Sequence, residues 1–255
     1  MAYHEFAYFY DEFNGEADYD ALYTEVKRQL DAHGIRDGIV ADLGCGTGEL
    51  TLMLTQAGYD MIGIDQSEQM LCVVQDKAQQ LGLSGQLLLL RQDLLQLDLY
   101  GTIRAAVSTF DTFNHLPDLD KAIGNAGFFM EKGGLLLFDM NTPYKHQEVL
   151  GGNRFTFEQE DARCVWQNHY DPATRRVEIQ VDIDYLETGE HFREDFFEYT
   201  YTLEEVRAAL EKHGFVLESV CDGETFGPLT QQSERFFFCA VKQYTQFGGM
   251  TRCQI

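Results

Sequence analysis

The sequence has few basic residues. Lysine and arginine number 19, against 42 aspartate and glutamate residues, so the formal charge is −23 and the isoelectric point is near 4.5. Nucleic acids and anionic membrane surfaces are bound through basic side chains that neutralise them, and no basic cluster compensates locally. The composition therefore argues against DNA, RNA or a membrane as a partner.

Long hydrophobic runs are also missing. No apolar run reaches the ~18–20 residues that a membrane-spanning helix needs. Residues 1–15 are acidic and aromatic, without the basic and apolar stretches that are typical of a signal peptide. Apolar residues still make up 44 % of the chain, which is enough for a core. We expect a soluble cytoplasmic protein, monomeric or homodimeric, with one large domain or one domain that carries an insertion.

Metal-binding and disulfide patterns are the third absence. None of the six cysteines forms a C-x-x-C pair, and none of the seven histidines forms an H-x-x-x-H pair. We therefore expect free thiols and no metal site.

The first 145 residues alternate strand and helix patterns, which is typical of an α/β domain with a parallel sheet and crossover helices. Apolar runs predict strands, and helical periodicity predicts the segments between them. The expected strands are 38–43, 61–64, 87–91, 105–109 and 135–138, and the expected helices are 18–33, 48–57, 67–81 and 118–131.

After about residue 150 the pattern changes to a period of two. Apolar side chains alternate with polar ones over 177–185, and similar runs lie near 153–160, 162–170 and 190–201. This pattern predicts half-buried antiparallel strands. We expect 151–201 to be an antiparallel β insertion in an α/β domain made of 1–150 and 202–243, with a flexible tail at 244–255. Thr202 and Glu205 form a capping box at the start of a helix, and strands are expected at 215–221 and 235–242.

A glycine-rich turn, Asp42-Leu43-Gly44-Cys45-Gly46-Thr47-Gly48, follows the first strand and opens a helix. Glycines let the backbone turn tightly and let a ligand approach the main chain, where helix N-terminal amides face it. The dinucleotide fingerprint G-x-G-x-x-G would need glycine at position 49 or 51, where this chain has Glu49 and Thr51. The spacing therefore disfavours NAD.

Two further polar positions follow the next two strands. Asp65 ends the second strand, where a carboxylate can accept hydrogen bonds from both hydroxyls of a ribose. Asp93 lies in Gln92-Asp93-Leu94 after the third strand, where it can accept a hydrogen bond from an adenine amino group. Together with the glycine turn, these residues indicate a nucleoside-containing ligand.

These segments resemble the motifs of class I S-adenosylmethionine-dependent methyltransferases. The likeness covers nearly the whole chain and extends to Tyr10-Asp11-x-Phe13, Asp111-x-x-Asn114-x-Leu116, Phe138-Asp139 and Ser233-Glu234-Arg235-Phe236-Phe237. The chain is most similar to bacterial small-molecule enzymes with an inserted antiparallel sheet, such as the aminosugar N-methyltransferases. The resemblance implies a Rossmann-like, seven-stranded, mostly parallel sheet, with the insertion as a lid.

The resemblance also implies roles for residues. Asp42 and the turn, with Gly44, Cys45, Gly46 and Gly48, would hold the methionine end of the cofactor, and Asp65 its ribose. The remaining expected cofactor-binding residues are Tyr10, Gln66, Met70, Gln92, Asp93, Leu94 and Phe110.

The methyl acceptor is expected to be a small molecule, with an amine favoured over a hydroxyl. Methyl transfer is an in-line displacement, so positioning supplies much of the catalysis. His115 is the candidate general base, because it follows the end of the fourth strand, where ligands bind in open α/β sheets. Asp111 is the alternative as base or amine anchor. A magnesium site of the catechol-methylating type needs adjacent Asp-Asn, but Met140 separates Asp139 from Asn141.

Three alternatives remain open at this point. A non-catalytic protein would bind the cofactor without turnover, and a nicotinamide oxidoreductase would bind NAD instead. An aminopropyltransferase would prefer the decarboxylated cofactor.

Overall fold

The computed structural model describes residues 18–158 and 162–243. Tyr10 and the tail 244–255 lie outside the described residues. Within these ranges, no helix is both long enough and apolar enough to cross a bilayer.

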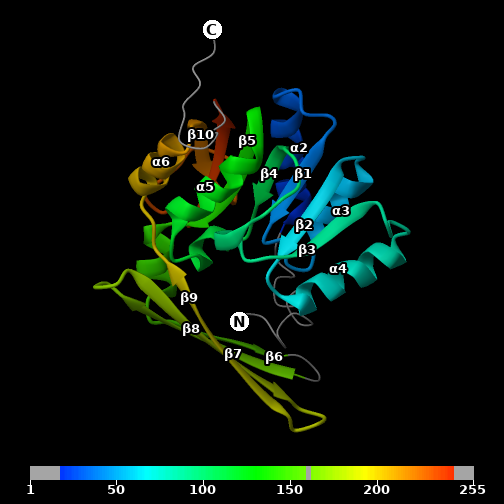
Figure 1. The fold of residues 1–255 in the computed structure, drawn as a ribbon. Coiled ribbons are helices and arrows are strands. Elements are labelled where there is room, and N and C mark those ends of the chain that lie inside the picture. Colours follow the sequence, from blue (N-terminus) through cyan, green and yellow to red (C-terminus); the bar gives the residue numbers. More distant parts are fainter. Residues whose placement is uncertain (1–17, 159–161, 244–255) are drawn as a thin grey trace.

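The main body is a seven-stranded sheet in the order β10-β11-β5-β4-β1-β2-β3. All neighbouring strands are parallel except β11, which is antiparallel to both β10 and β5. Figure 1 shows this sheet crossing the upper part of the molecule. The strands are β1 Ile39–Leu43, β2 Asp60–Asp65, β3 Leu87–Arg91, β4 Ile103–Ser108, β5 Met130–Asn141, β10 Phe215–Asp222 and β11 Arg235–Lys242.

Helices cover both faces of this sheet, because successive side chains of each strand point to opposite faces. One face packs against α5 and α6 through residues such as Leu43 and Phe138, and the other packs against α2 and α3 through residues such as Val40 and Leu137. The helices are α2 Tyr19–Ala32, α3 Glu49–Gln56, α4 Glu68–Gln80, α5 Leu119–Phe129 and α6 Leu203–Lys212, with short turns η2 Leu94–Gln96, η3 Thr112–His115 and η4 Lys145–Leu150. The result is a three-layer α/β/α domain, and it confirms the predicted fold class.

The strand order places β1 beside β4 at the middle of the sheet. The chain runs outward from β1 through β2 to β3, and in the other direction from β4 to β5. Ligands of open α/β sheets bind beyond the carboxyl ends of the strands at such a switch point. The topology therefore directs attention to the loops that follow β1 and β4.

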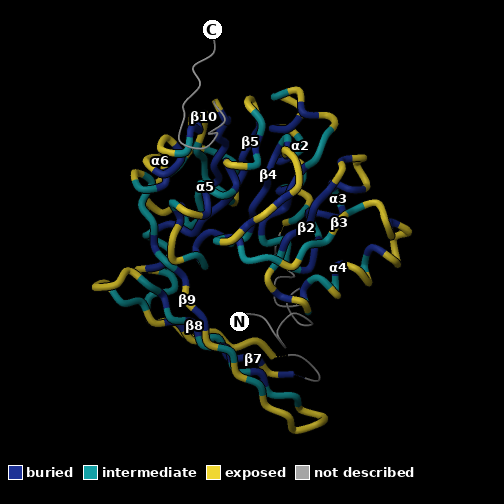
Figure 2. The backbone as a smooth tube through the Cα atoms, viewed as in Figure 1, coloured by how far each residue is buried: buried dark blue, intermediate teal, exposed yellow. Residues whose placement is uncertain are grey.

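Residues 154–199 form a separate four-stranded antiparallel sheet, which we call the lid sheet. Its strands are β6 Arg154–Glu158, β7 Ala162–Asp171, β8 Arg176–Tyr185 and β9 His191–Tyr199, paired in chain order. It lies below the main body in Figure 1, and Figure 2 shows buried and exposed residues alternating along it.

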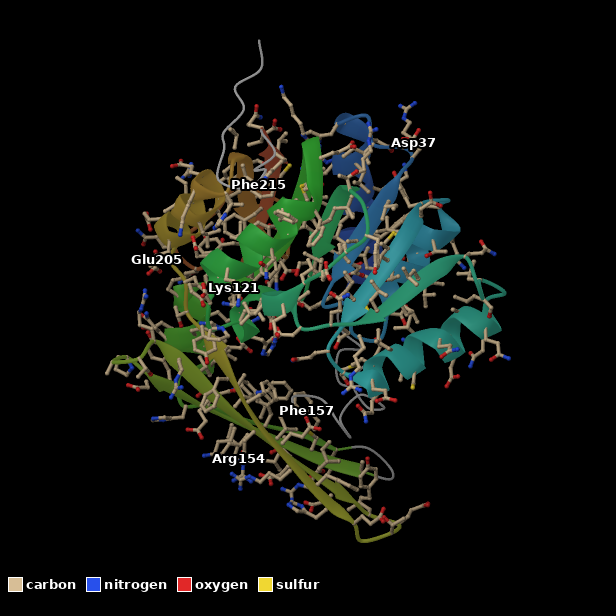
Figure 3. The ribbon with its side chains drawn as sticks, viewed as in Figure 1. Asp37, Lys121, Arg154, Phe157, Glu205 and Phe215 are labelled. Atoms are coloured by element: carbon tan, nitrogen blue, oxygen red, sulfur yellow. The ribbon has the colours of Figure 1, made fainter. Side chains whose placement is uncertain are left out.

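The two faces of the lid sheet differ in chemistry. The register places Phe157 beside Cys164, Ile183 and Phe192, whereas Arg154 faces the opposite way (Figure 3). The face that carries Phe157 also carries Phe196 and Glu198, which contact the main body. The lid sheet therefore turns its apolar face toward the carboxyl ends of the parallel strands.

One expected element differs from the structure. The fifth strand was expected at 135–138, but β5 spans Met130–Asn141. Its outer end is longer because β11 pairs along it as far as Asn141 opposite Arg235. The capping box at α6 is present as predicted, with Thr202 Oγ1 accepting from Glu205 N and Glu205 Oε2 accepting from Thr202 N.

Candidate active site

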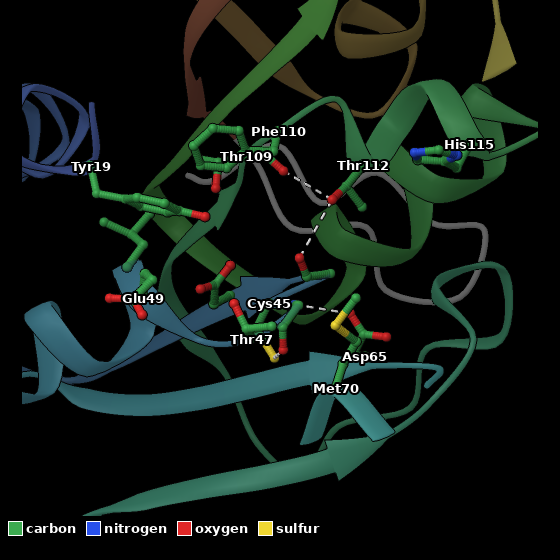
Figure 4. A pocket seen from close by; sticks show the side chains of 14 residues that line it. Tyr19, Cys45, Thr47, Glu49, Asp65, Met70, Thr109, Phe110, Thr112 and His115 are labelled. Carbon is green, nitrogen blue, oxygen red and sulfur yellow. Dashed lines mark hydrogen bonds between the residues drawn. The ribbon is translucent and has the colours of Figure 1, made fainter. Parts of the chain in front are cut away.

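Two adjoining cavities open at the carboxyl ends of β1, β2 and β4, and they share Gly44, Asp65, Thr112 and His115. Figure 4 shows the first of them from close by. The first is also lined by Tyr19, Asp42, Cys45, Gly46, Thr47, Glu49, Leu50, Met70, Thr109 and Phe110, and the second by Gln66, Gln92, Asp93, Leu94 and Leu116. The two cavities form one crevice, and most of the predicted cofactor-binding residues line it.

The glycine turn forms the floor of this crevice. Gly44, Gly46 and Gly48 all have a positive φ, between 52° and 82°. A Cβ on Gly46 would have no atom of another described residue within 4 Å, although Gly46 lines the first cavity. The turn therefore leaves room for a ligand against the main chain at Gly46. Gly48 lines neither cavity. It is the N-cap of α3, and a Cβ there would collide with Val74.

Asp42 is buried at the base of the first cavity, with 2 % of its surface exposed. Its Oδ2 accepts a hydrogen bond from Thr51 Oγ1, whereas its Oδ1 has no partner among the described residues. Burial raises the pKa of Asp42 to about 7, and the nearby Asp65 carboxylate adds to this effect. A buried acceptor without a donor is costly, so a ligand that brings a donor to Oδ1 would fit this position.

Asp65 ends β2 and joins the glycine turn to the next helix. Its Oδ2 accepts from Gly46 N at 3.0 Å and its Oδ1 from Ser67 N at 2.8 Å. Each carboxylate oxygen has further lone pairs that can accept hydroxyl donors. The main-chain bonds fix the carboxylate at the meeting point of the two cavities, with capacity left for a ligand.

The second cavity contains the residues that follow β2 and β3. Asp93 caps η2, because its Oδ1 accepts from Leu95 N and its Oδ2 from Gln96 Nε2. The side chain of Gln92 is bonded at both ends to the main chain of Asp98. These bonds shape the loop after β3, and the contribution of both residues to ligand binding stays a prediction.

The residues after β4 form the 110–111 turn. Phe110 and Asp111 have φ values of 53° and 54°, in the left-handed region that costs non-glycine residues on the order of 1–3 kcal/mol each. The Asp139 carboxylate accepts hydrogen bonds from both of their backbone N–H groups, at 2.9 Å and 2.7 Å. The ring of Phe110 lies 4.8 Å from that of Tyr19, and the two form one wall of the first cavity.

Asp111 lines neither cavity, and its Oδ1 accepts from Arg235 at 2.7 Å. Its Oδ2 lies 3.7 Å from His115 Nε2, and His115 lines both cavities. The ring of His115 also packs against Phe196 of the lid sheet, with 5.6 Å between centroids. The structure thus brings the two predicted catalytic residues together, with Asp111 behind His115.

Glu198 of β9 completes this side of the crevice. Its Oε2 accepts from Asn141 Nδ2 and pairs with His146 Nε2, both at 2.8 Å. Burial opposes ionisation of Glu198, but the hydrogen bond and charge of His146 prevail and lower its pKa to about 2. Polar atoms of Asp111, His115 and Glu198 lie within 4.8 Å of one another. Since Asp111 is engaged by Arg235 and Glu198 by His146, we assign no metal ion to this group.

Several residues of the site were not predicted from the sequence. Arg235 and Glu198 contact the site from segments far along the chain, and Tyr19 reaches it from the first turn of α2. Glu49 lines the first cavity and is paired with Lys77 at 2.5 Å. A carboxylate at this helix start repels a pyrophosphate, in agreement with the glycine spacing.

Comparisons with known proteins agree with this geometry. A family model described as a methyltransferase domain matches residues 40–134. A protein of Bacillus subtilis (strain 168) that carries the name methyltransferase YqeM is 30 % identical over 253 residues, which cover 96 % of this chain and 99 % of the relative. A similarly described methyltransferase of Geobacillus sp. (strain WCH70) is 29 % identical and is covered over its full length, with 95 % of this chain matched.

Solved structures share the fold. A S-adenosylmethionine-dependent methyltransferase from Clostridium acetobutylicum ATCC 824 has a TM-score of 0.84 at 23 % identity, covering 94 % of this chain and 98 % of that one. The sugar N-methyltransferase KedS8 from Streptoalloteichus sp ATCC 53650 has a TM-score of 0.73 at 20 % identity, with 92 % of each chain covered. On the near full-length match to its curated relatives, this chain belongs to the methyltransferases, and its fold is that of the class I S-adenosylmethionine-dependent methyltransferases.

Proposed function

We propose that this protein transfers a methyl group from S-adenosylmethionine to the amino group of a small molecule. The observation that carries the cofactor assignment is the crevice at the switch point, where the open Gly46 turn, the unpartnered Asp42 Oδ1 and the Asp65 carboxylate converge. S-adenosylmethionine supplies an electrophilic methyl group on a sulfonium. In this proposal Asp42 accepts from its amino group, Asp65 from its ribose hydroxyls, and the loop 92–94 binds its adenine.

The charges around His115 favour an amine as the acceptor. Asp111 and Glu198 place two carboxylates within 4.8 Å of His115. Both are already paired, with Arg235 and His146, and a carboxylate beside His115 stabilises the imidazolium that forms when His115 takes a proton from an amine. The acceptor nitrogen attacks the methyl carbon as a neutral amine. A carbon–nitrogen bond forms while the carbon–sulfur bond breaks, and in the same step the attacking nitrogen passes a proton to His115, so that a neutral methylated amine and S-adenosylhomocysteine are released.

The lid sheet belongs to the acceptor side of this proposal. Phe196 packs on His115, and Glu198 hydrogen-bonds to the end of β5, so the apolar face of the lid sheet covers the region around His115. We propose that segment 151–201 shields the acceptor from water. Apolar surroundings strengthen the electrostatic interactions inside a closed site.

Calorimetric titration tests the cofactor assignment, with S-adenosylhomocysteine, S-adenosylmethionine and NAD as ligands. We expect Asp65→Ala to weaken S-adenosylhomocysteine binding by about 10- to 100-fold, because hydrogen bonds to a charged group contribute ~1.5–3 kcal/mol. Asp60→Ala is the matched control, since Asp60 is exposed at the opposite end of the same strand. Binding of NAD with no response to the other two ligands would refute the proposal.

The acceptor class is tested by methyl transfer to pairs of primary amines and alcohols with the same carbon skeleton. Methyl-deuterated S-adenosylmethionine marks the product by its mass. N-methyl products are expected, whereas transfer confined to the alcohols would replace the amine by a hydroxyl acceptor. A protein that binds the cofactor tightly and methylates neither class in a broad panel would instead fit the non-catalytic alternative.

A further inference from the structure

Arg235, at the start of β11, lies behind the wall of the crevice. It contacts Phe110, which lines the wall, and the two carboxylates behind it, Asp111 and Asp139. Its guanidinium donates to Asp139 Oδ1 at 2.8 Å and to Asp111 Oδ1 at 2.7 Å. Its Cζ lies 5.8 Å from the centroid of the Phe110 ring. The side chain is only 14 % exposed. No other described cation is paired with Asp111 or Asp139 in this structure, apart from the neighbouring His115.

One of these two carboxylates, that of Asp139, holds the 110–111 turn. Asp139 is 3 % exposed and receives both backbone N–H groups of the turn as well as one arm of Arg235. Two consecutive non-glycine residues in the left-handed region persist only where the surroundings hold them there. The side chain that holds them, Asp139, is itself held by Arg235.

We propose that Arg235 is a positioning residue for the reaction: it clamps Asp139 and Asp111 and so holds Phe110 as the crevice wall and Asp111 beside His115. This inference rests on the proposed function, because it treats the crevice as the cofactor site. Arg235 touches neither ligand nor reacting atoms in this role and acts through the turn.

The chemistry of the clamp requires arginine. A guanidinium is planar and can donate through separate nitrogens to two carboxylates at once, whereas a lysine ammonium acts as a single point charge. Burial raises the pKa of Asp139, and the charge of Arg235 opposes that shift. Without Arg235, protonation of Asp139 becomes easier, and a carboxyl group accepts the two N–H bonds less strongly than a carboxylate.

The experiment measures binding of S-adenosylhomocysteine by calorimetry in Arg235→Met, Arg235→Lys and wild type. Arg175→Met is the matched control, because Arg175 makes a two-pronged ion pair with Glu205 away from the crevice. If the turn keeps its conformation in one molecule in ten, affinity falls about tenfold. We expect a loss of that size or more for Arg235→Met, a smaller loss for Arg235→Lys, and wild-type affinity for Arg175→Met.

Two further measurements separate positioning from a general loss of structure. Hydrogen exchange should speed up at the amides of Phe110 and Asp111 in Arg235→Met, while the central strands β1 and β4 keep their protection. As the pH decreases, the affinity of Arg235→Met should fall more steeply than that of wild type. The double variant Arg235→Met/Asp139→Asn should lose this extra slope, because an amide does not titrate. Among the described charged groups, Arg235 and Asp111 act on Asp139. His115 beside Asp111 and Asp42 elsewhere in the crevice are common to all variants.

The outcomes are distinct. Wild-type affinity and unchanged exchange at residues 110 and 111 in Arg235→Met would overturn the inference while leaving the proposed function intact. If Arg235→Met does not fold, Arg235→Lys carries the same test, and wild-type behaviour of that variant overturns the inference. Absence of S-adenosylhomocysteine binding in the wild-type protein would instead refute the proposed function.

Discussion

The crevice has two halves, one at the ends of β1, β2 and β3 and one at the ends of β4 and β5 and the start of β11. The two halves differ in the sequence separation between the residues that hydrogen-bond to each other. In the first half, Asp42 pairs with Thr51 nine residues later, and Gly46 N bonds to Asp65 across 19 residues. In the second half, Arg235 reaches Asp139 across 96 residues and Asp111 across 124. The half assigned to the cofactor is thus built by two adjacent βα units, and the half assigned to the acceptor is assembled from distant segments.

This difference indicates that cofactor binding and acceptor binding can be separated. The glycine turn is held by hydrogen bonds between residues that are close in the sequence. It can therefore stay the same when the segments around the acceptor are altered, because those segments come from other parts of the chain. If the separation is real, substitution of His115 should leave cofactor binding intact. Arg235 is the exception, because the 110–111 turn that it helps to hold supplies Phe110 to the wall of the first cavity. The following predictions test that separation in order of decreasing effect.

The largest effect is expected for His115→Ala. General acid–base catalysis contributes typically ~10²–10⁴-fold to a rate, so methyl transfer to an amine acceptor should decrease by about that factor. Binding of S-adenosylhomocysteine should stay within about threefold of wild type, a difference below ~0.7 kcal/mol. Rates are measured under single-turnover conditions and affinities by calorimetry. A parallel loss of cofactor affinity would show that the two halves do not act separately.

Asp42→Asn should make the protein without ligand more stable at pH 8 while it weakens cofactor binding. Burial raises the pKa of Asp42 from 3.8 to about 7. Because the pKa of Asp42 is higher in the folded state than in the unfolded state, proton binding stabilises the fold at pH values below the unfolded-state pKa. This stabilisation is lost as the pH rises through the folded-state pKa. Ionisation of this buried group at pH 8 therefore costs on the order of 2–4 kcal/mol.

Thermal unfolding at pH 5 and pH 8 measures this effect. The wild-type protein should lose stability between the two pH values, and Asp42→Asn should lose less. Asp37→Asn is the control, because Asp37 is 87 % exposed. An equal pH dependence in wild type and Asp42→Asn would contradict the assignment of the cost to Asp42.

The smallest effect is expected for Gly46→Ala, and Gly34→Ala offers a matched control. Both glycines have a positive φ, 52° and 70°, and at either position an added Cβ meets no atom within 4 Å from the rest of residues 18–158 and 162–243. Both variants should lose about 1–2 kcal/mol of unfolding free energy, since a left-handed conformation is unfavourable for alanine. Only Gly46→Ala should also bind S-adenosylhomocysteine more weakly, because its methyl group enters the cavity. Equal affinity in the two variants would place the ligand away from the glycine turn.

Much of the fold could be predicted from the sequence. The positions of β1, β3 and the lid strands follow from apolar periodicity, and the capping box at Thr202 follows from four consecutive residues. The length of β5 could not be predicted, because its outer residues are strand only through pairing with β11.

The residues of the candidate site also divide into those that the sequence predicted and those that it did not. Gly44, Gly46 and Asp65 were predicted and line the crevice, because the two glycines follow the end of β1 directly and Asp65 is the last residue of β2. Arg235 and Glu198 were missed as site residues. Glu198 lies in an alternating strand and Arg235 at the start of a continuously apolar one, and nothing in their neighbours indicates which loop each side chain meets.

The sequence by itself determined the glycine turn, the antiparallel insertion and the acidic residues at the ends of the first three strands, Asp42, Asp65 and Asp93. These features depend on backbone geometry and periodicity within a few residues, which short segments specify without help. Only the tertiary structure decided that Arg235 clamps Asp111 and Asp139, and that Glu198 is bonded to the end of β5. The order of strands in the sheet brings these side chains together, and that order depends on how the whole chain buries its apolar faces.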